Sequence, residues 1–364
     1  MKEGKDIVDI TASFVAGIAS GSLILRLGGS AYTSASIAVI LLSSSLFILW
    51  KSGCLEKRPA VRKNIFLQGL LFLTGLSCLF SAKISAGFSA SDPLFYGQVR
   101  QAAVYLSETI EELPHASAES KAMMKALILG DKCDLDREVV QAFRESGAAH
   151  ILALSGLHLG ILYLLINRFL KFFGNFPVVR LSKAIVILLV TGVYVLATGA
   201  SPSLIRAFLF ILLNETAQLL HRRTRLSTIL CSALFIQLVL DPLAIENVGF
   251  QLSYLAMAGI CWIHPVLKVQ DLHFPFLQKI WDTASLTLSC QVLTAPVVLY
   301  HFGTFPQYFL ITNLLALPLT TLVMVVSLLQ ILLGCMKIFP TFLSEIGNHI
   351  IHLLIYIIET ISHI

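Results

Sequence analysis

The sequence predicts an all-α protein that crosses a membrane many times, and three observations lead to this prediction. Of the 364 residues, 56% are hydrophobic and only 13% are charged, whereas soluble domains carry about 25% charged residues. The apolar residues gather into stretches of about 17–25 residues, the length of a membrane-spanning helix. Most basic residues lie in short loops between these stretches.

The apolar stretches predict about ten or eleven spans, some of them broken or kinked. The first stretch is weak because Arg26 interrupts it, and the stretch 227–240 is short. The stretch 308–335 is too long for one straight helix, so Pro318 is expected to kink or break it. The stretches are 10–27, 33–50, 64–81, 149–166, 184–200, 203–220, 227–240, 249–264, 283–300, 308–335 and 342–363.

The basic loops predict the orientation of the chain in the membrane. Residues 51–63, 168–183 and 221–225 are rich in lysine and arginine, and Lys268 and Lys279 mark a fourth loop. Cytoplasmic loops carry such an excess, and these four alternate correctly with the spans. We therefore expect all four loops and the N-terminus to lie in the cytoplasm.

One long polar segment, 82–147, separates N-terminal membrane helices at 1–81 from a membrane domain at 148–364. The expected orientation places this segment outside, and it holds ten acidic against seven basic residues. Its pattern predicts short amphipathic helices, one over 118–129 and another capped by Asp134. These helices are expected to lie on the membrane surface.

The composition also excludes several kinds of site. The seven cysteines are scattered without a CxxC pair, so neither a disulfide framework nor a metal site is predicted. No P-loop motif occurs, so any ATP-driven step must come from a partner. We expect no cofactor.

The most informative stretch is 147–160, where polar residues and glycines interrupt a predicted span. On one helix, His150 and His158 lie about 80° apart at about 100° per residue, loosely on one face. Ser155 and His158 are three residues apart and can meet. Such groups are expensive in hydrocarbon and usually line a path or contact a partner. In the plainer interpretation, backbone carbonyls satisfy the histidines, and small residues allow close helix packing at Gly147, Gly156 and Gly160.

Arg206 is a second candidate, because it lies about one turn inside the span 203–220. Pro202 is expected in the first helical turn, where its missing N–H is not needed. A long arginine side chain can snorkel to the membrane surface, or its guanidinium can bind phosphate oxygens. The sequence favours neither interpretation.

Two later regions combine breaks in the chain with polar groups. Asp241 and Pro242 interrupt the chain before one span, and the segment 291–318 places prolines inside two others. Irregular backbone at membrane depth lines a cavity or is covered by protein, although prolines can also be packing kinks. These regions add the path candidates Gln251, Tyr254 and Asn313, and the packing or kink positions Gly249, Pro296 and Pro318.

In this order, these blocks resemble the sequence pattern of the ComEC/Rec2 competence family, membrane channels that bring single-stranded DNA into bacteria. The resemblance covers about residues 115–335, and the histidine, serine and glycine block at 147–160 is its most specific part. Its other pieces are Leu129–Asp131, Phe143–Gly147, Ser203–Ala207, Asp241–Pro242, Gly249–Ser253, Thr294–Pro296, Phe302–Gly303 and Asn313–Pro318.

The resemblance implies a channel component in the bacterial plasma (inner) membrane that translocates single-stranded DNA during DNA uptake. The implied path candidates are His150, Ser155, His158, Arg206, Gln251, Tyr254 and Asn313. Long family members carry an OB-like domain and a metallo-β-lactamase-like domain, and the sequence matches neither. We therefore expect no catalytic site and a separate nuclease. Further expected partners are a DNA receptor, a cytoplasmic ATPase or helicase, membrane lipid and a second copy of the chain.

Two alternatives remain open at this point. His150, Ser155 and His158 could form an intramembrane hydrolase, although no acid is placed to orient His158. The family scaffold could also carry another polyanion, because a fold does not fix a substrate.

Overall fold

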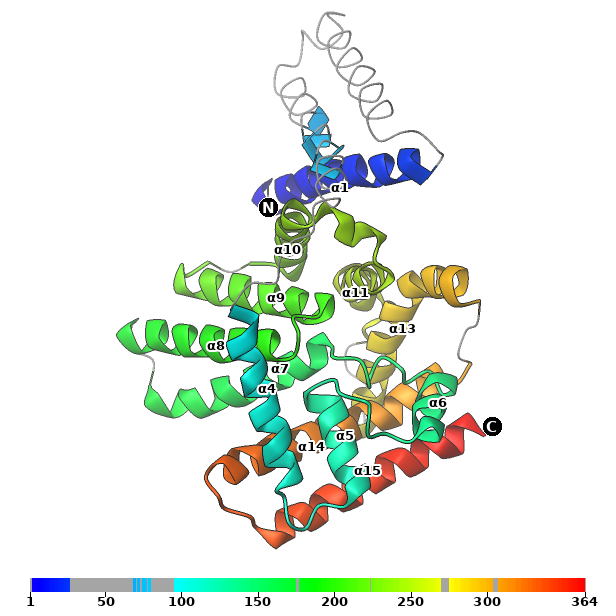
Figure 1. The fold of residues 1–364 in the computed structure, drawn as a ribbon. Coiled ribbons are helices and arrows are strands. Elements are labelled where there is room, and N and C mark those ends of the chain that lie inside the picture. The colour runs from blue at the N-terminus through cyan, green and yellow to red at the C-terminus, as the bar shows by residue number, and fades with distance from the viewer. Residues whose placement is uncertain are drawn as a thin grey trace, which may run out of the picture. The chain divides into compact units, whose positions relative to one another are not determined.

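The computed structural model describes residues 2–26, 68–69, 71–72, 74–76, 78–79, 95–174, 177–222, 224–269, 275–303 and 307–363 (Figure 1). Every regular element in those ranges is helical, which confirms the predicted all-α class. Eight of the eleven predicted apolar stretches coincide with helices, and a ninth, 149–166, is helical only from Gly156. The stretch 33–50 lies outside the described residues, as does half of 64–81.

The helices group into two compact units. Residues 1–91 and 223–258 form unit 1, and residues 92–222 and 259–364 form unit 2. Unit 1 contains α1 (Lys2–Arg26), α10 (Leu226–Leu240), the short 3₁₀ helix η2 (Pro242–Glu246) and α11 (Val248–Ala258).

In unit 1, α1 packs on α10, and the aromatic rings of Phe14 and Phe235 lie 4.8 Å apart. The predicted break after α10 is confirmed, because α10 ends at Leu240 and η2 begins at Pro242. Asp241 makes this break stable by accepting a hydrogen bond from the Leu243 N–H at 3.1 Å.

Unit 2 carries the remaining helices and the larger core. Its helices α4 to α6 belong to the predicted external segment, and α7 to α9 and α13 to α15 to the predicted membrane domain. They are α4 (Phe95–Glu111), α5 (Ala118–Ile128), α6 (Arg137–Glu145), α7 (Gly156–Leu170), η1 (Lys171–Phe173), α8 (Pro177–Ala197), α9 (Pro202–Leu219), η3 (Gly259–Ile263), α12 (His264–Leu267), α13 (Pro275–Phe302), α14 (Phe309–Cys335) and α15 (Thr341–Ser362).

Two helix groups shape unit 2. The consecutive helices α7, α8 and α9 all contact one another, and α14 pairs with α15. Helices α4 and α5 pack on α14, and α5 and α6 pack on α15. Their shared core includes Met123, Phe143, Leu159, Leu204 and Leu354, all fully buried or nearly so. Helices α4 to α6 are therefore part of the same core as the predicted membrane helices.

The lengths and composition of the helices show a protein that crosses the membrane several times. Five described helices are long and apolar enough to cross a membrane. They are Val179–Ala197, Val248–Leu267, Pro275–Phe302, Phe309–Cys335 and Thr341–Ser362; the shorter apolar helices are Ile7–Leu23, Gly156–Leu170 and Leu226–Leu240.

The expected effect of the prolines needs one correction. Helix α14 runs without interruption through Pro318, so this residue does not break it. Helix α13 likewise continues through Pro296. A helix of 27 residues is about 40 Å long, and tilting lets such a helix fit a bilayer without a break.

A close crossing in unit 2 depends on Gly259, at the start of η3. A Cβ atom added there would lie 2.0 Å from the carbonyl oxygen of Ser289 on α13. Because that oxygen belongs to the backbone, a larger residue must push η3 and α13 apart. A Cβ at Gly160 would meet nothing within 4 Å of the described chain.

We expect Gly259→Ala to lower the free energy of unfolding by about 1–3 kcal/mol, the usual cost of overpacking. Thermal unfolding of the purified protein in detergent measures this change. The matched control is Gly160→Ala, which should not destabilise the protein, because alanine favours helix and the position is open. Equal stability of the two variants would contradict the close crossing.

Candidate functional site

The segment that carries His150 and Ser155 is not helical, which corrects the predicted span 149–166. Residues 148–155 form turns and irregular chain, and α7 begins only at Gly156. Ile151 and Leu152 are buried although they are not in a helix, so the apolar sequence is explained by packing. The expected angle of about 80° between His150 and His158 therefore does not apply.

Ser155 and His158 instead form the N-terminal cap of α7, which confirms their predicted approach. Ser155 accepts a hydrogen bond from the Leu157 N–H at 3.3 Å, and its own N–H donates to His158 Nδ1 at 3.1 Å. Ser155 Oγ also lies 2.9 Å from His158 Nδ1. This is a capping box in which histidine takes the usual place of glutamate or glutamine.

The two histidines differ in their surroundings. The His158 side chain is only 1% exposed, and its Nε2 atom has no hydrogen-bond partner in the described part of the chain. His150 is exposed, and its Nδ1 lies 3.2 Å from the carbonyl oxygen of Gly147. His150 thus makes the kind of backbone contact that the plainer interpretation expects, and His158 is the buried member of the pair. Across the described ranges, no group of three or more His, Cys, Asp or Glu is placed to hold a metal ion.

Contacts at both ends hold the segment 146–155 in place. At its start, the hydroxyl of Thr312 on α14 donates to the carbonyl oxygen of Ser146 at 2.8 Å. At its end, Gly156 lies against α9, because a Cβ atom added at Gly156 would be 3.5 Å from the Cβ atom of Ala207. Gly147 has φ +83°, so its role is conformational and not the predicted helix packing.

Arg206 belongs to α9, whose start has the predicted form. Ser201 accepts the Leu204 N–H at 3.4 Å, and Pro202 occupies the first turn. The Arg206 side chain is only 2% exposed and donates from Nη2 to Ser203 Oγ at 2.9 Å. It therefore lies inside unit 2 and does not snorkel to an exposed surface.

The starts of α7 and α9 lie at the same end of unit 2. These helices are parallel, with α8 between them in the sequence, and they meet at Gly156 and Ala207. The Tyr194 hydroxyl, near the end of α8, donates to the Ile128 carbonyl of α5 at 2.7 Å, so α5 lies at this end too. Helix N-termini attract negative charge, and His158 and Arg206 add polar donors beside them.

The remaining path candidates belong to other helices. Asn313 is mostly buried in α14, one residue after Thr312, and its Oδ1 has no hydrogen-bond partner in the described ranges. Gln251 and Tyr254 belong to unit 1 and serve local contacts there. Gln251 donates to the Ile245 carbonyl at 2.7 Å, and Tyr254 donates to Gln237 Oε1 at 3.0 Å. In unit 1, Gly249 lies beside Asn247, whose Oδ1 would be 3.2 Å from an added Cβ.

A polar pair that was not predicted from the sequence joins the same two helices. The Tyr163 hydroxyl of α7 donates to Glu215 Oε1 of α9 at 2.7 Å, and Glu215 is buried. Glu215 is an acid within the apolar stretch 203–220, so the signal that singled out Arg206 could have found it.

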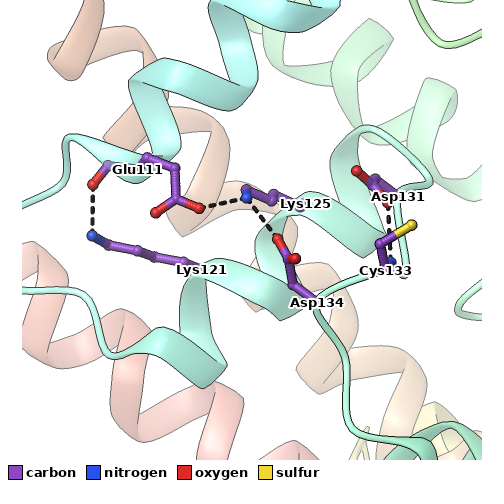
Figure 2. A network of polar contacts seen from close by, with 6 residues as sticks. All are labelled: Glu111, Lys121, Lys125, Asp131, Cys133 and Asp134. Carbon is purple, nitrogen blue, oxygen red and sulfur yellow. Dashed lines mark hydrogen bonds and ion pairs between the residues drawn. The ribbon is translucent and has the colours of Figure 1, made fainter.

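A buried lysine in α5 was not predicted either (Figure 2). Lys125 of α5 bonds to Glu111 of α4, and also to Asp134 Oδ2 at 2.7 Å. These contacts raise its pKa, with the Asp134 bond contributing most. Asp134 therefore does not cap α6 as expected. Helix α6 begins at Arg137, after Asp136, which makes no capping side-chain bond.

Lys125 supports the site through the corner that follows α5. The Lys125 carbonyl accepts the N–H groups of Leu129 and Asp131 at 2.8 and 3.3 Å. Between them, Gly130 has φ +77° and lies against the Leu154 side chain, one residue before Ser155. The ion pairs thus hold a corner that contacts the segment before α7.

We expect removal of the carboxylates to harm the protein more than removal of the lysine. The double variant Glu111→Gln with Asp134→Asn leaves a buried ammonium without its charge partners, which costs about 1–3 kcal/mol. In Lys125→Met, the carboxylates are 55% exposed and can hydrate. Thermal unfolding in detergent compares the two, and Lys121→Met is the matched lysine control. A more severe effect of Lys125→Met would contradict this assignment.

The pH dependence of the ion pairs follows from the raised pKa of Lys125. Their stabilisation is complete below the ordinary lysine pKa of 10.5. It is lost as the pH rises through the raised value in the folded protein. Hydrogen exchange of α5, compared between wild type and Lys125→Met, should therefore show a difference at neutral pH that disappears at strongly alkaline pH.

Comparison with known proteins identifies the family. A family model described as "Competence protein" matches residues 127–364. ComE operon protein 3 of Bacillus subtilis (strain 168) is 28% identical over 208 residues, which are 56% of this chain and 25% of that protein. The uncharacterized protein YcaI of Escherichia coli (strain K12) is 26% identical over 210 residues, 56% of this chain and 28% of that protein.

The chain thus matches about a quarter of the length of these relatives. No solved structure matches it. The family match includes the cap at Ser155, the buried Arg206 and all of α13 to α15. Because it extends over well more than half of the chain, this protein belongs to the competence protein family, as its ComEC/Rec2-like pattern predicted.

Proposed function

We propose that this protein forms part of the path by which single-stranded DNA crosses the bacterial plasma membrane into the cytoplasm. Membership of the competence family supports a role in DNA uptake. The observation that carries the finer proposal is the burial of Arg206 and His158 at the starts of two neighbouring helices. Polar groups inside a membrane domain are costly and usually mark a pathway.

The chemistry of this end of α7 and α9 suits a polyanion in transit. DNA binding depends chiefly on contacts to phosphate, which guanidinium groups and helix N-termini supply. Transport also requires that each contact be weak enough to release the strand. One buried arginine with one neutral histidine donor meets this requirement better than a dense cluster of lysines.

We infer that this end of unit 2 faces the outside. The opposite ends of α7 and α8 carry Arg168, Lys171, Arg180 and Lys183, the excess expected of a cytoplasmic loop. The contact between Tyr194 and Ile128 places the end of α5 at the same end of unit 2 as the starts of α7 and α9. The N-terminus is then cytoplasmic, and the strand enters at His158 and Arg206. A nuclease, a DNA receptor, a cytoplasmic ATPase or helicase and a second copy of the chain remain proposed partners.

A hydrolase is the second candidate, because Ser155 Oγ lies 2.9 Å from His158 Nδ1. However, the same Nδ1 accepts the Ser155 backbone N–H, which is the geometry of a helix cap. No carboxylate orients the ring, since Nε2 has no partner within the described ranges. Transport of another polyanion would use the same groups as DNA transport, so the uptake experiment below decides between them.

Substitutions of Ser155 separate the cap from a catalytic nucleophile. Ser155→Ala removes the cap and should lower stability by about 1 kcal/mol. Ser155→Asp keeps a capping oxygen but has no nucleophilic hydroxyl, so it should retain wild-type abundance and DNA uptake. Loss of uptake in Ser155→Asp, at normal abundance and thermal stability, would favour the hydrolase.

The main test is natural transformation in cells that lack this protein. We expect transformation to fall in the deletion, to return with wild type, and to stay at least about tenfold lower with Arg206→Ala or His158→Ala. The exposed Arg137 on α6 provides the control variant Arg137→Ala, which should restore transformation. Each variant is quantified in isolated membranes.

If the deletion leaves transformation unchanged, DNA is not the substrate and another polyanion must be sought. If the deletion abolishes transformation but both variants restore it, the path does not include His158 and Arg206.

A further inference from the structure

The two ring nitrogens of His158 differ in their hydrogen bonding: Nδ1 takes part in the helix cap, whereas Nε2 has no partner in the described chain. The Ser155 N–H can only donate, so Nδ1, which receives it at 3.1 Å, acts as an acceptor. A neutral imidazole carries its proton on the other nitrogen, so the cap fixes the proton on Nε2. The start of α7 thus presents a hydrogen-bond donor of known position.

This donor is buried and unused. The ring is 1% exposed, and Nε2 meets no hydrogen-bond acceptor in the described chain. A buried donor without an acceptor costs free energy, so it disfavours the state in which it is found. Binding of a ligand that supplies an acceptor recovers this free energy. Such a ligand therefore shifts the protein toward the state in which Nε2 is accessible.

The surroundings of Nε2 favour an anionic acceptor. His158 is the third residue of α7, within the turn where free N–H groups and the helix dipole attract negative charge. Neither 146–170 nor 198–214 contains an acidic residue. Gly156 touches Ala207, so the buried Arg206 lies on the neighbouring turn of α9.

We propose that His158 Nε2–H donates a hydrogen bond to a non-bridging phosphodiester oxygen of the translocating strand. This inference rests on the proposed function and adds the group that is recognised, which is the sugar–phosphate backbone and not the bases. Recognition of this kind is independent of sequence, as a DNA uptake path requires. Since Nε2 is buried, a local movement must expose it before the strand can bind there.

Two substitutions of His158 separate the cap from the donor. In His158→Asn, the amide oxygen can take the place of Nδ1 and accept the Ser155 N–H, but no donor reaches the Nε2 position. In His158→Gln, the longer amide can place an N–H near Nε2. We expect both variants to reach wild-type levels in the membrane. Transformation should fall at least about tenfold in His158→Asn and be partly rescued in His158→Gln.

A second measurement needs no variant. Wild-type cells are given single strands that carry either a run of uncharged methylphosphonate linkages or a run of abasic sites with normal phosphates. We expect the methylphosphonate run to reduce uptake and the abasic run to pass. The opposite pattern would show that the bases are recognised and would overturn the proposal.

The deletion tests the proposed function, whereas the His158 variants test the phosphate contact, so the two can be contradicted separately. If the deletion strain takes up DNA normally, the proposed function is wrong. If the deletion abolishes uptake but His158→Asn behaves as wild type, the path stands and the phosphate contact is wrong. Equal loss in His158→Asn and His158→Gln would also overturn the proposal, because the donor would then make no difference.

Discussion

The hydrogen bonds that begin α7 at Ser155 are the constraint on which the site depends. A helix in a membrane must satisfy its first N–H groups within the protein, because hydrocarbon offers no acceptors. Ser155 and His158 do so reciprocally, and in doing so they fix the ring of His158 and the place where α7 starts. That start in turn brings Gly156 against Ala207, which sets the neighbouring turn of α9 with its buried arginine.

Sequence reasoning located the helices well where hydrophobicity alone decides, and it failed where packing over long distances decides. The start of α9 was readable because Ser201 and Pro202 are local signals. The start of α7 could not be located in the same way. Ile151 and Leu152 are apolar, as residues of a membrane span would be, but they are buried in a segment that is not helical. His158 was selected as a candidate residue, but no sequence pattern reveals that its Nε2 meets no acceptor among the described residues. Asp134 was assigned to a cap because its partner Lys125 lies in another element.

Helices α7 and α9 carry polar residues in two zones along their length. Near their starts lie His158 and Arg206, and further along Tyr163 bonds to Glu215. Helices in lipid gain little from hydrophobic contact with one another, so hydrogen bonds and small residues determine which pairs form. The same polar groups that suit a path therefore also specify that α7 and α9 are neighbours.

The order of the helices has a consequence for biosynthesis. The chain leaves unit 2 at residue 222 and returns to it only at residue 259, after the segment that belongs to unit 1. Ser146 can form its hydrogen bond with Thr312 only after 166 further residues have been made. The hydrogen bond between Ser117 and Asn348 likewise requires 231 further residues. During translation, α5 and α6 thus leave the ribosome long before α14 and α15, the helices that cover them. Until then their apolar faces need a temporary cover, so the nascent chain of this protein is a natural client for a membrane insertase or chaperone.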